Sequence, residues 1–189
     1  MRAARRFTTL ACAAALAVGV AACGEQAHPR TADANNNGGY VDAGPITYQL
    51  QISRVLNPFS REDGQYVAGL PSGVAPPTAD QSWYGVFLWA KNQTHKPEQT
   101  GDNFVVVDTQ GNKYYPIKLN PQTNPYAWTS QSLAPLQTEP KPGTTASFGP
   151  TQGGLLLFKI SNTAYSNRPL TLEILGTGNR PQATISLDL

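Results

Sequence analysis

The chain has 189 residues, of which 14% are charged, and its formal net charge at pH 7 is +2. A charge this close to zero offers no basic face, which excludes proteins that bind nucleic acids through an electrostatic patch. Only two cysteines are present, Cys12 and Cys23, and this excludes a disulfide framework. The 17 glycines and 16 prolines, together with many short β-rich runs, favour an all-β domain.

The first 22 residues have the parts of a secretory signal peptide. Arg2, Arg5 and Arg6 form a basic start, and an apolar run follows from Phe7 to Val20. This run is shorter than the roughly 20 residues that a membrane-spanning helix needs, so we expect residues 1–22 to be removed. Arg5-Arg6 also resembles part of a twin-arginine signal, but Phe7 follows the pair directly, and we favour the general secretory route.

Small residues surround the second cysteine. The stretch Val20-Ala21-Ala22-Cys23 resembles a bacterial lipobox, in which the Cys thiol is alkylated with diacylglycerol and cleavage after Ala22 makes Cys23 the new N-terminus. Each buried methylene adds about 0.8 kcal/mol of membrane affinity, so two acyl chains would anchor the protein at the extracytoplasmic face of the cell membrane. The alternative is an ordinary signal peptide cleaved after Ala22, which would release a soluble, antigen-like secreted protein.

The remaining chain divides into a polar segment and one domain. Removing 22 of the 189 residues leaves 167, with 11 basic and 12 acidic residues and a net charge of −1. Residues 24–44 include Asn35-Asn36-Asn37-Gly38-Gly39 and almost no large apolar side chain, which predicts a flexible tether over residues 23–44. We expect the domain to cover residues 45–189.

Alternating apolar residues predict seven or eight strands of an antiparallel β-sandwich. Asp108-Thr109-Gln110-Gly111-Asn112 has the composition of a hairpin turn, and residues 144–148 are expected to pair briefly as a strand. The other predicted strands cover residues 48–53, 83–92, 104–108, 113–119, 154–160, 170–174 and 185–189.

Two long Pro-rich loops, residues 57–80 and 120–143, interrupt the strands. Loops this long in a domain are usually functional or disordered. Tyr66, Val67 and Leu70 in the first predict a short edge segment or a plug. Tyr126, Trp128 and other apolar residues in the second predict a loop that lies against the sandwich.

The strand 83–92 is apolar on both faces, which indicates a central strand covered on both sides. Aromatic residues at strand spacing usually pack into a core, and we favour that interpretation. The alternative is a ligand-binding aromatic surface. The candidate residues for this binding surface are Trp83, Trp89, Tyr126 and Trp128.

Several segments together resemble the immunoglobulin-like domain of bacterial lipoproteins, a family often mislabelled as telomeric repeat-binding factor and similar in fold to the secreted immunoprotective antigen of mycobacteria. The resemblance covers about residues 45–175 and implies an immunoglobulin-like fold and an envelope location; it carries over no catalytic or ligand-binding residue. The segments are Asn57-Pro58, Lys91-Asn92, Phe104-Val105-Val106-Val107-Asp108, Gly111-Asn112-Lys113-Tyr114, Pro142-Gly143 and Leu156-Leu157-Phe158-Lys159-Ile160.

No motif predicts catalysis, a metal or a cofactor. The sequence lacks the Gly-x-Ser-x-Gly of a nucleophile elbow. His95, Glu98 and Asp102 share a polar turn and could meet around a cation, although a solvated turn is the simpler interpretation.

These observations predict a binding or interaction module of the cell envelope rather than an enzyme. The expected partners are the membrane, through diacylglycerol on Cys23, and an envelope protein or glycan, with no nucleic acid. A passive structural or envelope-maintenance role is the alternative, in which the two loops only pack over the sandwich.

Overall fold

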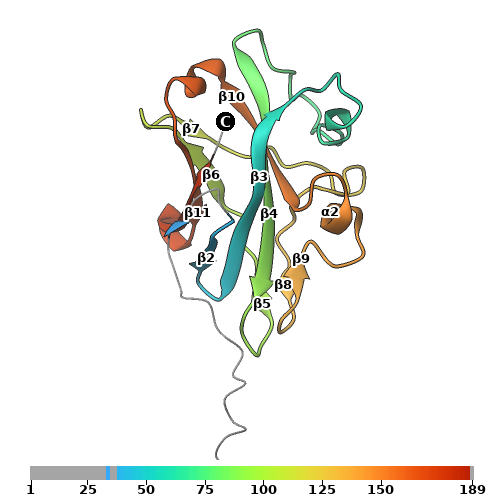
Figure 1. Cartoon of the computed structure of the whole chain (residues 1–189), viewed down its shortest axis with the longest axis vertical. Coiled ribbons are helices and arrows are strands. Elements are labelled where there is room, and N and C mark those ends of the chain that lie inside the picture. The colour runs from blue at the N-terminus through green and yellow to red at the C-terminus, as the bar shows by residue number, and fades with distance from the viewer. Residues whose placement is uncertain (1–32, 35–37, 188–189) are drawn as a thin grey trace, which may run out of the picture.

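The computed structural model describes residues 33–34 and 38–187 and confirms an all-β fold (Figure 1). Within these residues the longest helix is a single turn, and seven strands have four or more residues. These seven are β2 (Tyr40–Ala43), β3 (Ile46–Leu56), β4 (Gln81–Asn92), β6 (Phe104–Val107), β10 (Gly154–Ser161), β11 (Leu170–Leu175) and β12 (Pro181–Leu187). The two-residue strands are β1 (Asp33–Ala34), β5 (Glu98–Gln99), β7 (Lys113–Tyr114), β8 (Ser132–Leu133) and β9 (Thr138–Glu139).

The strands form two main sheets with the connectivity of an immunoglobulin-like sandwich. One sheet has the order β1-β12-β11-β6-β7, and the other has the order β10-β4-β3-β2, with β9 extending the β10 edge beside β4. In the immunoglobulin fold one sheet contains strands A, B and E, and the other contains G, F and C, followed by C′ in variable-type domains. Here β3, β4 and β10 occupy the positions of A, B and E, and β12, β11, β6 and β7 occupy those of G, F, C and C′.

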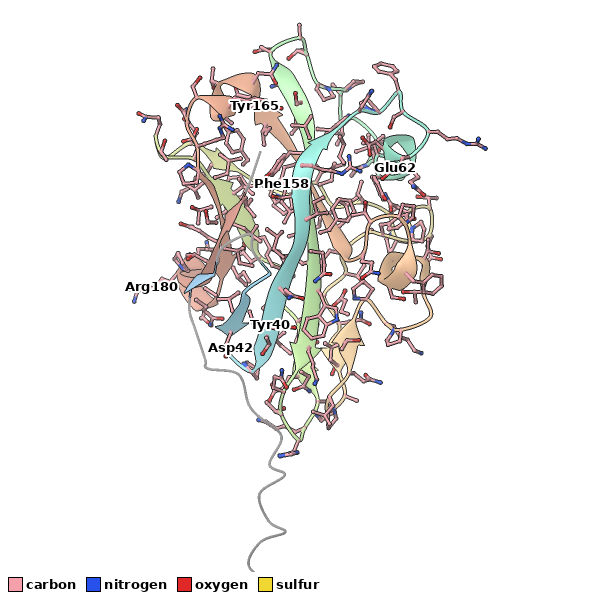
Figure 2. All side chains as sticks on the ribbon, in the orientation of Figure 1. Tyr40, Asp42, Glu62, Phe158, Tyr165 and Arg180 are labelled. Carbon is pink, nitrogen blue, oxygen red and sulfur yellow. The ribbon has the colours of Figure 1, made fainter. Side chains whose placement is uncertain are left out.

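The main core lies between these two sheets. The inward residues of β4 alternate with outward ones, and Tyr84, Val86 and Leu88 are fully buried against β6, β11 and β12. Figure 2 shows side chains filling this space, with Phe158 of β10 in the interior. Because apolar burial is the main favourable term in folding, this core holds the two sheets together.

The domain begins earlier than residue 45. β1 pairs in parallel with β12, and β2 pairs with β3, so both strands belong to the sheets. Val41 and Ala43 point into the core, while Tyr40 and Asp42 alternate outward. The predicted tether over residues 23–44 is therefore too long. The alternating apolar pattern of Tyr40–Ala43 spans only four residues and directly follows the polar Asn-Gly stretch, so composition alone assigns it to the tether. Residues 1–32, which include Ala22 and Cys23, lie outside the described part of the chain.

The two long loops fold back onto the outer face of the β10-β4-β3 sheet. Their apolar residues pack on Trp83, Phe87, Leu155 and Leu157 to form a second core outside the sandwich. The predicted plug at Tyr66 is confirmed, since this side chain is fully buried against Phe87 and Tyr126, with ring centroids 5.0 and 4.8 Å away. The double apolar face of β4 therefore has a core on each side.

One predicted strand is a helix instead. Residues Thr145–Phe148 form the single-turn helix α2, which starts after Pro142-Gly143 and buries only Ala146. Five residues are too few for the apolar pattern to distinguish the 3.6-residue period of a helix from the two-residue period of a strand. The preceding Gly143, at a φ of 86°, turns the chain away from the sheet edge. The described residues include no helix of a length and hydropathy that would span a membrane.

The predicted hairpin turn between β6 and β7 is confirmed. Gly111 adopts a φ of 82°, and the Asp108 carboxylate accepts hydrogen bonds from the backbone N–H groups of Gln110 and Asn112, both at 2.9 Å. Burial disfavours ionisation of Asp108, but hydrogen bonds from Asn112, Asn167 and these backbone groups outweigh it and lower its pKa to about 2.

Candidate binding site

Two of the four aromatic residues predicted for a binding surface are interior residues. Trp83 is 3% exposed and Tyr126 is 2% exposed, and both belong to the second core under the loops. Their inclusion in an exposed surface is wrong, because the loops that cover them fold back on the sheet. The favoured interpretation, that the aromatic residues of strand 83–92 pack, holds for Trp83, and the burial of Tyr126 agrees with the prediction that the second loop lies against the sandwich.

Trp128 is half-buried and held by contacts to the main core. Its ring lies 5.6 Å from that of Phe104 and 6.1 Å from that of Tyr48, and its Nε1–H donates to the carbonyl of Gly101 at 2.9 Å. The indole is therefore fixed by one hydrogen bond and two ring contacts, and it lines a separate pocket of about 270 Å³.

Trp89 is the exception among the four. It lies on the outward face of β4, beyond the end of the second core, and is half-buried. Tyr40 of β2 packs against it with ring centroids 6.1 Å apart in an edge-on arrangement, and remains 43% exposed. The register explains the contact, since Tyr40 is opposite Gln49 and Gln49 is opposite Trp89. The structure thus leaves one aromatic pair on the uncovered part of this sheet face.

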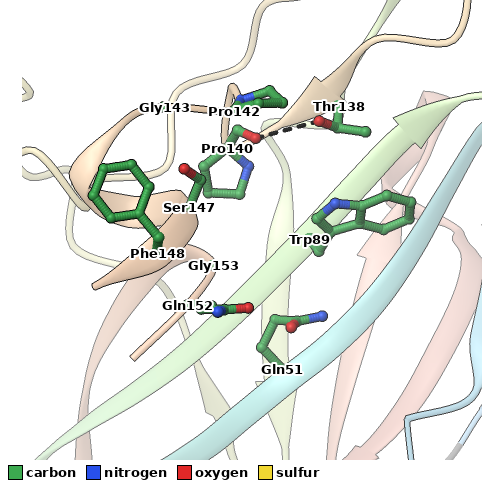
Figure 3. Close-up of a pocket in the computed structure, with 10 residues that line it drawn as sticks. All are labelled: Gln51, Trp89, Thr138, Pro140, Pro142, Gly143, Ser147, Phe148, Gln152 and Gly153. Carbon is green, nitrogen blue, oxygen red and sulfur yellow. Dashed lines mark hydrogen bonds between the residues drawn. The ribbon is translucent and has the colours of Figure 1, made fainter. Parts of the chain in front are cut away.

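A pocket of about 370 Å³ adjoins Trp89. Such a volume falls within the range of about 300–1,000 Å³ typical of small-molecule sites. Figure 3 shows Gln51 and Trp89 on neighbouring strands, with Pro140, Ser147 and Phe148 across the pocket and Gln152 beside Gln51. The ten lining residues are Gln51, Trp89, Thr138, Pro140, Pro142, Gly143, Ser147, Phe148, Gln152 and Gly153.

Each wall of the pocket has a local structural cause. Gln51 projects at the β-bulge where the register of β3 against β4 shifts between Leu50 and Ile52. The opposite wall is the Pro142-Gly143 turn and α2, whose Phe148 is 65% exposed at the rim. Gly153 closes the floor at a φ of 115°, where an added Cβ would lie 3.0 Å from the backbone of Phe87 and Leu88.

A buried carboxyl group lies behind this pocket. Glu139 of β9, between the lining residues Thr138 and Pro140, is 4% exposed and accepts a hydrogen bond from the Thr100 hydroxyl at 3.2 Å. Burial raises the pKa of Glu139 to about 7, against the effect of hydrogen bonds from Thr100, Gln131 and the backbone of Thr129. Glu139 is not among the residues that line the Trp89 pocket, and it lines a separate pocket of about 220 Å³ together with Thr129 and Gln131.

The suggested cation site at His95 does not form. The part of the chain that the structure describes contains no cluster of three or more His, Cys, Asp or Glu side chains suited to a metal. Glu98 instead pairs with Lys96 at 3.3 Å, and Asp102 lines a separate pocket beside Trp128. His95 itself is exposed.

Sequence reasoning singled out Trp89 but missed Gln51, Phe148 and Gln152. They come from three separate segments, and only the bulge in β3 and the short helix bring them together. The available signal was the Pro142-Gly143 pair, which marks a turn before a predicted edge segment.

No protein-family model matches the chain, and no curated protein matches it in sequence. Three solved structures are similar in fold. YcdA of Bacillus subtilis, described as a "putative lipoprotein", has a TM-score of 0.48 and 13% identity over 79% of this chain and 38% of its own, so this chain spans less than half of its length. YjhA of Bacillus subtilis has a TM-score of 0.48 and 11% identity over 84% of this chain and 100% of its own. A β-sandwich protein of Clostridium difficile has a TM-score of 0.40 and 11% identity over 87% of this chain and 100% of its own. These similarities are too weak to assign a family or a function.

Proposed function

We propose that this β-sandwich is a lipid-anchored binding module of the cell envelope, tethered through Cys23 and binding its ligand at the Trp89 pocket. The observation that carries the proposal is that the outer face of the β10-β4-β3 sheet is covered over most of its area but open at one pocket. The loops cover most of the outer face of β4 and β10, but a pocket remains between Trp89 and residues 138–143 of the second loop, and α2 borders it.

Selective exposure of aromatic residues supports this function. A domain that buries Trp83, Phe87 and Tyr126 on this face has the means to bury large rings, but Tyr40 and Phe148 remain exposed beside the pocket. Exposed aromatic groups around a concave site are typical of binding surfaces. The proposal is one of binding without catalysis, and reproducible turnover in a broad hydrolase screen would contradict that part of it.

The test is retention of envelope components by the full-length protein after extraction from membranes. Trp89→Ala should reduce specific retention from a solubilised envelope extract by about tenfold, because it removes the central ring of the site. Tyr115→Ala is the matched control, since Tyr115 is 63% exposed and lies outside the pocket lining. Equal retention by the two variants and the wild type would contradict the proposed function.

A passive envelope-maintenance role is the second candidate. The observation that favours it is the second core, which shows the long loops serving as a packed cover. This role predicts that both loops resist protease in the folded protein and that Trp89→Ala has no effect on envelope contacts. Retention that depends on Trp89 would exclude it.

A further inference from the structure

We propose that the ligand of the Trp89 pocket is an uncharged sugar chain. This inference rests on the proposed function and adds the chemical class of the ligand. Its starting observation is that none of the ten lining side chains ionises: the lining consists of two glutamines, two hydroxyl residues, two aromatic residues, two prolines and two glycines. Glu139, the buried carboxyl group between Thr138 and Pro140, does not line this pocket.

Charged ligands do not fit this lining. An anion needs cationic or N–H donors and a cation needs oxygen anions, and burying either without a partner is costly. The charged residues around the pocket have both signs, because the exposed Lys141 lies between the lining residues Pro140 and Pro142, and Asp42 and Lys91 lie on either side of Thr47 in the next row of the sheet. The surroundings therefore favour neither sign.

The hydrogen bonds within the pocket indicate which polar ligand fits. Gln51 donates its Nε2–H to Gln49 at 2.8 Å, and the Ser147 hydroxyl donates to the carbonyl of Thr144 at 2.8 Å. Ser147 thereby uses its only donor and keeps the acceptor lone pairs of its hydroxyl oxygen, whereas Gln51 keeps the second N–H of its amide as well as its carbonyl oxygen. The Gln152 amide, which has no hydrogen-bond partner in the described residues, adds a donor and an acceptor.

Uncharged groups that both donate and accept hydrogen bonds match a ligand that does the same. The hydroxyl groups of a neutral sugar donate and accept, and the C–H face of its ring can pack on an aromatic side chain such as Trp89. A proline-rich peptide could also pack on aromatic rings, but its backbone lacks N–H donors at proline and would leave these acceptors unpaired. The exposed ring of Phe148 at the other rim suits a second sugar unit, and hence a chain.

The test is electrophoresis of the full-length, detergent-extracted protein through gels that contain a dissolved polysaccharide. The probe is the neutral polysaccharide fraction of the cell envelope, digested with protease and separated from anionic polymers by ion exchange. The neutral fraction should retard the wild type, and the anionic fraction should not. Trp89→Ala should weaken binding about tenfold, and Ser147→Ala severalfold through loss of one acceptor.

The variants change no charge, so their mobility without polysaccharide should equal that of the wild type. Phe148→Ala is a second test of the same surface, because its side chain lies outside both cores and its loss should not affect folding. Tyr115→Ala is the control that should bind normally.

The inference is overturned if the neutral fraction does not retard the protein, if the anionic fraction retards it more, or if retardation does not depend on Trp89. Failure of the two proposals can be distinguished. Retention from whole envelope extract that depends on Trp89, without retardation by the neutral fraction, would leave the binding function standing and exclude a neutral glycan. Loss of both would exclude the site itself.

Discussion

Single buried polar side chains fix the positions of the loops in this domain through hydrogen bonds to their backbone. Asn124 is fully buried, and its Nδ2–H donates to the carbonyls of Tyr66 and Ala68, both at 3.0 Å, while its Oδ1 accepts from the backbone of Tyr126. One amide therefore satisfies three backbone groups of two different loops. Such a group stabilises by preventing unpaired polar atoms in the interior, which would each cost about 1–3 kcal/mol.

Glu139 makes stability dependent on pH. The pKa of this carboxyl group rises from 4.5 to about 7 on folding, so the folded protein binds the proton more tightly than the unfolded chain. Between these values the free energy of unfolding must fall as pH rises, by up to about 3 kcal/mol, and then level off. Glu139→Gln should remove this fall, and at pH 8 the variant should be more stable than the wild type.

Chemical denaturation of both proteins between pH 4 and 8 measures this difference. Comparison with the variant separates Glu139 from the aspartates with lowered pKa, Asp63 and Asp108, whose contribution is lost as pH falls instead. Glu173→Gln, on a half-buried position of β11, is the control and should keep the slope of the wild type. Parallel pH profiles for wild type and Glu139→Gln would refute the assignment.

The hydroxyl group of Tyr66 has no hydrogen-bond partner within the described residues. Folding therefore removes it from water without compensation, and Tyr66→Phe should raise the free energy of unfolding by about 1 kcal/mol. In thermal unfolding this corresponds to an increase in Tm of about 2–4 °C for a domain of this size. Tyr126→Phe is the control of opposite sign, because it removes a hydroxyl that donates to Gln65 at 3.1 Å. A lower Tm for Tyr66→Phe would contradict this account.

At the scale of elements, the main addition to the two-sheet sandwich is the loop cover, formed by residues 57–80 and 120–143 on the outer face of one sheet. Arg54 of β3 binds Asp63 of the first loop at 2.6 Å, and Asn124 joins the two loops to each other. Together they fix the loops over the outer face of the sheet, where β4 and β10 would otherwise expose Trp83, Phe87 and Leu155. The boundary of this cover is what defines the pocket at Trp89.

Asn124→Ala should release that cover. Loss of its three hydrogen bonds leaves buried backbone groups unpaired, and we expect a loss of at least about 2 kcal/mol together with faster protease cleavage in residues 57–80 and 120–143. Limited proteolysis followed by mass spectrometry locates the cuts. Asn120→Ala, an exposed position of the same loop whose side chain accepts only a local bond from Gln122, is the matched control. Cleavage at equal rates in both variants would contradict the role given to Asn124.

The strands could be predicted from sequence because the alternation of apolar and polar residues that marks a strand involves only neighbouring residues in the chain. Alternation marked β3, β11 and β12, and apolar residues on both faces of β4 correctly indicated a cover on each side. The pocket could not be predicted in this way. Whether Trp83 or Trp89 is exposed depends on where the two long loops return to the sheet, and those contacts depend on single long-range bonds such as Asn124 to Tyr66.

At the scale of the molecule, the proposed lipid anchor at Cys23 has a direct test. Cys23→Ala should abolish the anchor, because only a thiol forms the thioether to diacylglycerol. Intact mass of the membrane-extracted protein should show a chain that begins at Cys23 with a lipid increment, and the variant should lack both. A lipid-free chain of wild-type protein in the medium would instead support the secreted, soluble alternative.

The three tryptophans make the most direct test of the binding site, because each lies in a different environment. Trp83 is buried, Trp128 donates its indole N–H to Gly101, and Trp89 borders the pocket. The measurement is the set of three indole N–H resonances in an NMR spectrum of the isotope-labelled, full-length protein during titration with solubilised envelope extract. A shift of the Trp89 resonance, with Trp83 and Trp128 unchanged, is the predicted result. A Trp89 resonance that stays in place, or moves only together with the other two, would contradict the assignment of this pocket as the binding site.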